Sequence, residues 1–438
     1  MPDTDRSSSA RGGELVLRGG RVIDASGERM ADVRVADGRV VEVGAALTGD
    51  RVLDAEGCIV APGLVDLHVH LREPGGEDAE TIETGARAAA LGGFTAVVAM
   101  PNTEPPQDDP AVVAAVLAAG AASVCDVHAA GAITRGRAGE ELAPMGELHA
   151  LGVRIFTDDG ACVASAGVMR SALEYAGSLP GAVLGQHAED PTLATGHMHE
   201  GEWSSRLGIP GRPAIAEETI IARDCALVEL TGTPVHFLHV STAGSVEIVR
   251  AARARGLPVT AEVAPHHFTL TDACCASFDP RYKVHPPLRT EADIAAIKAG
   301  LADGTIDAIA SDHAPHPTES KERPFEDAPP GMLGLETALA LTLTELVEPG
   351  VLSLTDALAR LSWGPAAIAG LAEHGRTIEA GASANLCVID PRLEWQVEAE
   401  RLASRARNTP YEGRRLTGKA RHTICRGEAV VIDGEAQR

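Results

Sequence analysis

Short apolar runs that end in polar residues recur along this chain, and an Ala- and Leu-rich segment usually follows each run. Eight runs lie at 63–70, 94–103, 124–134, 152–160, 181–190, 234–242, 258–267 and 307–316. Their Val, Ile, Phe and Thr content favours strands. Segments with a helical composition lie at 79–92, 110–120, 166–177, 216–232, 243–256 and 292–304. All six end at Gly, which is typical of a helix C-terminus.

Strands that alternate with helices predict a parallel sheet whose faces are covered by the helices. Eight such units predict an α/β fold of the closed (β/α)₈, TIM-barrel type. An open doubly wound sheet is the alternative. It is disfavoured because no G-x-G-x-x-G motif follows the first strand.

Both ends of the chain have a different pattern, with short strand-like runs separated by Gly-containing turns. We predict a small β-sandwich domain formed by residues 14–60 and 376–438, with the barrel at 61–375 inserted between them. Residues 1–13 are expected to be a disordered leader.

Composition narrows the function classes. The net charge of −24 argues against nucleic acid as a partner, and an anionic substrate would need local positive charge. No stretch approaches the ~20 apolar residues of a membrane span, and the opening residues lack the apolar core of a signal peptide. We therefore expect a cytoplasmic protein. Eight scattered cysteines without a C-x-x-C pair indicate buried thiols rather than disulfides or a thiolate zinc site.

Polar residues gather where the predicted strands end, which is the face on which barrel enzymes build their active sites. They are His68, His70, Arg72, Asn102, Asp158, Asp159, His187, Glu189, Asp190, His239, His266, His267, Asp312, His313 and His316. One histidine at a strand end is usually structural. So many His and Asp residues at one end of separate strands are not expected by chance.

Imidazoles and carboxylates without thiolates suit zinc. The candidate ligands are His68, His70, Asp159, His187, His239 and Asp312. Six exceed the three that one catalytic zinc usually takes, so two ions are expected, with an anionic protein bridge between them. Adjacent strand residues face opposite ways. We therefore expect Asp159 to point inward as the bridge and Asp158 to support it.

The motifs "DLHVHLREPG", "MPNT", "FTDDG", "HAED", "HVST", "TAEVAPHH" and "SDHAPH" resemble those of the amidohydrolase superfamily. Within it, the chain is similar to bacterial dihydroorotases of the separate-chain type, from about residue 14 to a C-terminal stretch that includes "RNTPYEGRRLTGKARHTICRG".

The resemblance implies the reversible hydrolysis of dihydroorotate to N-carbamoyl-aspartate in pyrimidine biosynthesis, with two Zn²⁺ ions and a bridging hydroxide. It implies that His68, His70 and Asp312 hold one zinc, that His187 and His239 hold the other, and that Asp159 bridges both. The hydroxide would attack the ring amide carbonyl. Asp312 would be the catalytic residue, taking the proton and returning it to the leaving nitrogen.

The resemblance also implies substrate contacts. Arg72, Asn102 and His316 would hold the substrate carboxylate, and the backbone at Pro330 and Gly331 would contact the ring. A guanidinium suits this role because it binds carboxylates in a bidentate manner.

His285 and the stretch 316–331 each allow more than one interpretation. His285 stands where the family pattern usually has a substrate-contacting asparagine, so its size and charge put the substrate geometry in question. The polar stretch 316–331 is either a solvated loop or a lid over the ring.

Two alternatives compete with this interpretation. Hydantoinases and allantoinases resemble the chain but bridge their metals with a carboxylated lysine on the fourth strand, where run 152–160 has no lysine. A non-catalytic homologue that scaffolds aspartate transcarbamoylase would be expected to have lost metal ligands, and all six are present. A homodimer and a complex with aspartate transcarbamoylase are the protein partners considered.

Overall fold

Eight short parallel strands form the centre of the computed structural model, which describes residues 13–438. They are β6 (Leu64–Val69), β7 (Phe94–Ala99), β8 (Asp126–Ala129), β9 (Ile155–Thr157), β10 (Val183–Gln186), β13 (Val235–Phe237), β14 (Val259–Val263) and β15 (Ala308–Ile309). Two sheets, β6-β7-β8 and β9-β10-β13-β14-β15, are joined by parallel bridges between Gly131 and Phe156 and between Val69 and His313. These bridges close the ring, so the predicted barrel is confirmed and the open sheet is wrong.

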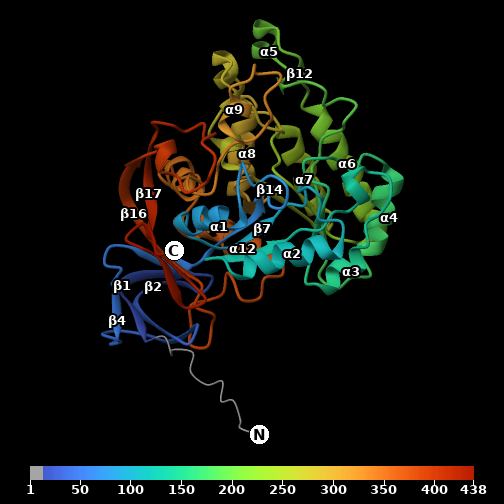
Figure 1. The fold of residues 1–438 in the computed structure, drawn as a ribbon. Coiled ribbons are helices and arrows are strands. Elements are labelled where there is room, and N and C mark those ends of the chain that lie inside the picture. Colours follow the sequence, from blue (N-terminus) through green and yellow to red (C-terminus); the bar gives the residue numbers. More distant parts are fainter. Residues whose placement is uncertain (1–12) are drawn as a thin grey trace.

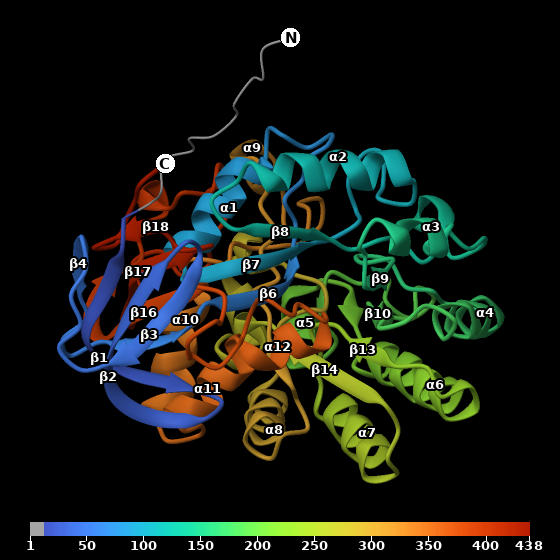
Figure 2. The same ribbon diagram turned by 90° about the horizontal axis from the view of Figure 1, so that it is seen from below.

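The helices surround the barrel (Figure 2). The six predicted helices are α1 (Ile82–Leu91), α2 (Pro110–Ala121), α4 (Ala166–Ala176), α6 (Ile215–Thr231), α7 (Ala243–Ala254) and α8 (Glu291–Ala302). Thr81, Ser165, Thr242 and Thr290 cap four of them by accepting a hydrogen bond from an N-terminal amide. The remaining helices are α3 (Met145–Ala150), α5 (Glu202–Leu207), α9 (Thr318–Lys321), α10 (Ala338–Thr342), α11 (Leu354–Leu361) and α12 (Trp363–Ile368).

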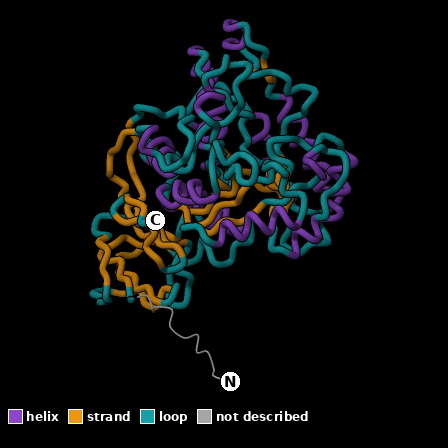
Figure 3. The backbone as a smooth tube through the Cα atoms, in the orientation of Figure 1, coloured by secondary structure: helices purple, strands orange, loops and turns teal. Residues whose placement is uncertain are grey.

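A separate nine-stranded sheet contains both terminal segments, and Figure 3 shows its strands gathered to one side of the barrel. Its strands are β1 (Leu15–Asp24), β2 (Gly27–Ala36), β3 (Arg39–Gly44), β4 (Arg51–Asp54), β5 (Ile59–Pro62), β16 (Leu386–Gln396), β17 (Arg415–Cys425), β18 (Glu428–Ile432) and β19 (Glu435–Ala436). The order is β19-β18-β17-β16-β5-β1-β2-β3, with β4 on β1. Both ends of the chain therefore build one domain, as predicted.

Buried contacts join the two terminal segments. The carboxylate of Asp24 is fully buried and accepts hydrogen bonds from the Ile378 amide at 2.9 Å and from Arg29 at 2.9 Å. Apolar residues of both segments, such as Val33 and Val388, share one core cluster. The domain limits predicted from the sequence remain predictions. The leader predicted at 1–13 lies, except for Gly13, outside the described residues.

The same sheet also packs on the barrel. Cys387 and Ile389 of β16 belong to the core cluster that contains Leu64 and Phe94. Gly93, at φ +91°, lies so close to Cys387 that a Cβ atom would come within 2.7 Å of its sulfur. A glycine is required at this contact both by its backbone conformation and by the lack of space.

A long excursion from the barrel follows β10 and includes α5 and the two-residue strands β11 (Met198–His199) and β12 (Gly211–Arg212). Figure 1 shows this excursion and α9 above the barrel, on the side away from the N-terminal strands. Over residues 13–438, none of the helices has the length and apolar character needed to cross a bilayer.

Candidate metal and substrate site

All six predicted metal ligands lie at the C-terminal ends of barrel strands and are at most 6% exposed. Their side chains converge although they come from five different strand ends. Two sets of potential ligand atoms form there: one from His68, His70 and Asp159, and one from Asp159, His187 and His239. Asp159 belongs to both sets.

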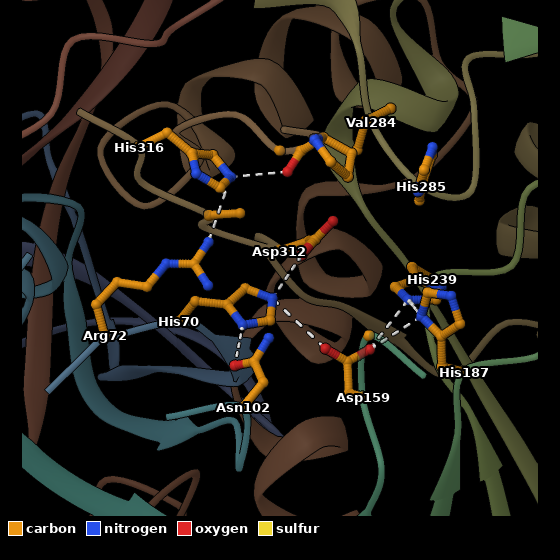
Figure 4. Close-up of a pocket in the computed structure, with 14 residues that line it drawn as sticks. His70, Arg72, Asn102, Asp159, His187, His239, Val284, His285, Asp312 and His316 are labelled. Atoms are coloured by element: carbon orange, nitrogen blue, oxygen red, sulfur yellow. Dashed lines mark hydrogen bonds and ion pairs between the residues drawn. The ribbon is translucent and has the colours of Figure 1, made fainter. Parts of the chain in front are cut away.

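The two oxygen atoms of Asp159 face different histidine pairs, of which Figure 4 shows His70, His187 and His239. Oδ2 lies 3.2 Å from Nε2 of His68 and 3.5 Å from Nε2 of His70. Oδ1 lies 3.2 Å from Nδ1 of His187 and 3.3 Å from Nε2 of His239. One carboxylate thus lies between two imidazole pairs, which is the arrangement needed to bridge two cations.

Asp158 faces away from this centre. Its Oδ1 accepts hydrogen bonds from the backbone amides of Ile133 and Thr134, both at 2.9 Å, and its other oxygen accepts from the Thr134 hydroxyl. Asp158 therefore holds the loop after β8 against the loop after β9. The expectation that the adjacent aspartates face opposite ways agrees with this arrangement.

Acceptors outside the centre fix three of the histidine rings. Nδ1 of His68 lies 2.8 Å from Oε1 of Glu262, and Nδ1 of His70 lies 2.8 Å from Oδ1 of Asn102. On the other side, Nε2 of His187 lies 3.1 Å from Oε2 of Glu189. Because these oxygens can only accept, each outer nitrogen carries the proton. In the neutral form of each ring, the inner nitrogen then has its lone pair directed at the centre.

These inner lone pairs suit a divalent cation. Nδ1 of His187 and Nε2 of His239 lie 3.0 Å apart and both face Asp159. Burial lowers the pKa of His187, but hydrogen bonds to Asp159 and Glu189 outweigh burial and raise it to about 9. Protons therefore occupy this cluster when no cation is bound, and metal binding would release them. Neutral imidazoles with carboxylate oxygens are a common donor set for zinc.

Glu262 contacts the ring of His68, and it was not among the residues predicted from the sequence. It lies within run 258–267 and is fully buried, accepting from His68 and, at 3.0 Å, from Nε2 of His236. Its signal in the sequence was a carboxylate in the middle of an apolar strand, where an uncompensated charge would be costly.

Asp312 lies beside the first ligand set. Its Oδ1 is 3.3 Å from Nε2 of His70 and 3.6 Å from Nε2 of His68, and its Oδ2 is 3.8 Å from Nε2 of His266. Burial would raise the pKa of Asp312, but the hydrogen bond with His70 and the charge of His68 hold it below its usual value. The side chain is thus an ionised carboxylate that can accept a proton.

Three residues at this centre have backbones in the left-handed region that favours glycine. Their φ angles are +62° for Arg72, +33° for His239 and +46° for Asp312. Such backbones cost about 1–3 kcal/mol each and persist where surrounding contacts hold them. The strand ends are therefore bent in a way that the strand pattern alone did not predict.

A cavity of about 220 Å³ opens above the two ligand sets. It is lined by every residue predicted to contact substrate: Arg72, Asn102, His285, His316, Pro330 and Gly331. Arg72 and His316 lie together at one side, and His285 lies on the other side beyond His239 (Figure 4). Burial lowers the pKa of Arg72 to about 10, so the guanidinium stays charged near neutral pH. The cavity thus has the local positive charge that an anionic ligand needs.

His285 carries no charge in this environment. Burial lowers its pKa to about 3, and the positive charge of Arg212 contributes. Its Nε2 is buried and has no hydrogen-bond partner among residues 13–438. A neutral imidazole with a free nitrogen can hydrogen-bond a ligand, as the asparagine of the family pattern could.

The stretch 316–331 is packed against the protein. Lys321, 8% exposed, donates to the carbonyls of Pro280 at 3.0 Å and Pro329 at 2.7 Å. Lys283 reaches back from the opposite segment to the carbonyl of Glu326 at 2.7 Å. The stretch is therefore anchored to the segment 280–283, while its residues 318–319, 322–324 and 326–327 are exposed. The two interpretations of the stretch, a solvated loop and a lid, both stay predictions.

A closed barrel with paired His and Asp ligand sets at its strand ends defines a hydrolase of the amidohydrolase superfamily. Among solved structures, the chain resembles the L-hydantoinase (dihydropyrimidinase) of Arthrobacter aurescens with a TM-score of 0.87 and 27% identity, covering 98% of both chains. The dihydropyrimidinase of Brevibacillus agri NCHU1002 gives 0.85 and 25% identity, covering 97% of this chain and 96% of the other.

Sequence similarity assigns the chain to a narrower family within this superfamily. The family described as Dihydro-orotase-like matches residues 57–245. The dihydroorotase of Pelotomaculum thermopropionicum is 51% identical over 96% of this chain and 99% of that relative. The dihydroorotase of Streptomyces coelicolor is 50% identical with the same coverage of each chain. The chain belongs to the dihydroorotase family, which confirms the resemblance read from the motifs.

The two adjacent aspartates offer a matched test of the metal centre. Asp159→Asn should lower the divalent metal bound per purified chain by more than about tenfold. Loss of an outer contact of a metal site already lowers metal affinity by about 10- to 100-fold, and loss of a direct ligand should cost at least as much. Asp158→Asn should retain metal and lower the melting temperature, because it weakens only the loop contacts. Elemental analysis and thermal unfolding measure both. Equal metal loss in the two variants would contradict the assignment of Asp159.

Proposed function

We propose that this chain is a zinc-dependent dihydroorotase, which reversibly hydrolyses (S)-dihydroorotate to N-carbamoyl-L-aspartate in de novo pyrimidine biosynthesis. The observation that carries the proposal is the position of Asp159 between two histidine pairs, beneath a cavity that contains Arg72. Identity of about one half to proteins named dihydroorotase supports the same substrate.

Two zinc ions are proposed from the donor set. One zinc would be held by His68, His70 and Asp312, and the other by His187 and His239. Asp159 would contact both ions. When bound, such ions activate water and polarise a carbonyl group. Glu262, Asn102 and Glu189 would keep the ligand rings in their orientation and tautomer.

The substrate carboxylate would be held at one side of the cavity. Arg72 supplies the charge. Its Nε donates to the Pro315 carbonyl at 3.1 Å and its Nη2 lies 3.5 Å from Nε2 of His316, which leaves Nη1 for a ligand. Because Oδ1 of Asn102 accepts from His70, the amide Nδ2 of Asn102 is free to donate. Together with His316, they would fix the ring so that its amide carbonyl faces Asp159 and Asp312.

Asp312 would move the proton. As an ionised carboxylate beside His70, it would accept a proton from the attacking water. It would then return that proton to the ring nitrogen that leaves, so that one carboxylate is first base and then acid. In the reverse direction the same residue would deprotonate the carbamoyl nitrogen.

The alternative cyclic amidases have a specific observation in their favour, the TM-score of 0.87 to an L-hydantoinase. The bridge is the counter-argument, since Asp159 stands where a carboxylated lysine would be expected and β9 contains no lysine. The non-catalytic scaffold has less support, because all six ligand residues are present and converge in the site.

We also propose a cytoplasmic location, and a homodimer or a complex with aspartate transcarbamoylase as the assembly. The eight cysteines are all free thiols, which is typical of a reducing compartment. We expect light scattering to give a mass of two chains, or a larger mass when the transcarbamoylase is added. A single-chain mass under both conditions would contradict both assemblies.

Purified protein should open the dihydroorotate ring and close carbamoyl-aspartate, and removal of metal by a chelator should abolish both directions. Ultraviolet absorbance of the ring follows the reaction. Hydantoin and allantoin are the controls, because they present a related cyclic amide, in a five-membered ring, without the carboxylate that Arg72 would bind. Turnover of either control without turnover of dihydroorotate would overturn the proposal in favour of another cyclic amidase.

Asp312→Asn should lower kcat by about 10²–10⁴-fold, the range of a lost general acid–base, because an amide cannot accept the proton. The metal content should fall much less, since Asp159 and the four histidines remain. Steady-state rates and elemental analysis on the same sample separate the two effects. Retained turnover at normal metal content would refute the role of Asp312.

A further inference from the structure

One asparagine from the C-terminal segment is bonded to the cavity wall. Asn408 lies between β16 and β17 of the terminal sheet and is 3% exposed. Its Nδ2 donates to the carbonyl of Ala314 at 2.9 Å and to the carbonyl of Gly331 at 3.1 Å. Its Oδ1 accepts from the amide of His316 at 3.1 Å. The orientation of the amide group is unambiguous because two partners accept and one donates.

The three residues bonded to Asn408 line the substrate cavity. Ala314 and His316 follow β15 and lie just before and at the start of the stretch 316–331, whereas Gly331 lies at its far end. The asparagine therefore joins two separate segments and sets the distance between them. The His316 ring completes the same wall, since its Nε2 donates to the Pro330 carbonyl at 2.7 Å.

Further contacts fix the segment that carries Asn408. On one side, Glu80 accepts from the Arg405 amide at 3.2 Å and contacts Nε2 of His313 at 3.2 Å, next to Asp312. On the other side, the Tyr411 hydroxyl lies 3.0 Å from the Thr269 hydroxyl. Asn408 is thus held at both ends against the loops of the barrel, which gives it a rigid base.

We propose that Asn408 is a positioning residue for substrate: it holds the wall formed by Ala314, His316, Pro330 and Gly331 at the spacing that the ring and its carboxylate require. This inference rests on the proposed dihydroorotase function. Only an asparagine-sized side chain supplies two donors and one acceptor at these three backbone groups. The buried backbone groups would otherwise lose their partners.

Asn385 provides a matched control. It is also buried, at 5% exposure, and also joins two segments: its Nδ2 donates to the Glu373 carbonyl at 3.1 Å and its Oδ1 accepts from the Arg426 amide at 2.7 Å. Its backbone carbonyl accepts from Gly63, just before β6, so it lies at the end of the barrel opposite the cavity. Its loss should destabilise the protein without touching the substrate wall.

The kinetic test compares Asn408→Ala, Asn408→Asp and Asn385→Ala with the wild type. Asn408→Ala should raise KM for dihydroorotate by about tenfold or more, with a smaller change in kcat and unchanged metal content, because a displaced wall loses substrate contacts. Asn408→Asp should raise KM at least as much, since its oxygens face two carbonyls. Asn385→Ala should keep KM within about twofold. An unchanged KM in Asn408→Ala, or an equal rise in Asn385→Ala, would overturn the proposal.

Hydrogen exchange gives a readout that does not depend on turnover. His316 lies between Pro315 and Pro317, which have no amide hydrogen, so a peptide around it reports the bond to Asn408 clearly. Exchange at His316 should accelerate in Asn408→Ala and stay unchanged in Asn385→Ala. Unchanged exchange refutes the positioning role alone, whereas an inactive wild type refutes the proposed function alone. Failure of both Asn408 variants to fold would also overturn the proposal, because the residue would then serve the fold.

Discussion

The shared carboxylate of Asp159 is the interaction on which the rest of the site depends. Its two oxygens each face a histidine pair at 3.2–3.5 Å, and it is almost completely buried. Burial would raise the pKa of this carboxyl, but the charge of His68 and the hydrogen bonds from His187 and His239 hold it well below its usual value. A buried anion is stable only with compensating charge around it, so the histidines, and the cations they would bind, form a unit with it.

Around this unit, the protein supplies acceptors that fix each ring before any ligand arrives. Glu262, Asn102 and Glu189 each accept from an outer histidine nitrogen. Two of them have further partners: Glu262 also contacts His236, and Glu189 forms an ion pair with Arg212 at 2.6 Å. Rings held in this way lose little freedom when they bind a metal, which is how outer contacts strengthen a metal site.

The terminal domain takes part in the site as well as in stability. Its sheet shares a core with the barrel through Cys387 and Ile389. The segment between its strands reaches over the barrel loops and bonds the cavity wall through Asn408. The inserted arrangement of the chain therefore brings a residue near position 400 against loops near 314 and 331. Through these hydrogen bonds, the terminal domain contributes to the structure of the cavity wall as well as to the packing of the fold.

The pattern of residues along the chain was enough to predict the barrel, six of its helices and the candidate ligand residues. Strand and helix periods are local, and polar residues at the ends of apolar runs, such as His187 and His239, must meet once those strands share a barrel. Even the opposite orientations of Asp158 and Asp159 followed from the alternation of side chains along a strand. The sequence did not reveal which oxygen faces which ring, that Glu262 contacts His68, or that Asn408 bonds the cavity wall. These contacts join residues far apart in the chain, and their distances depend on how whole segments pack, which no local pattern encodes.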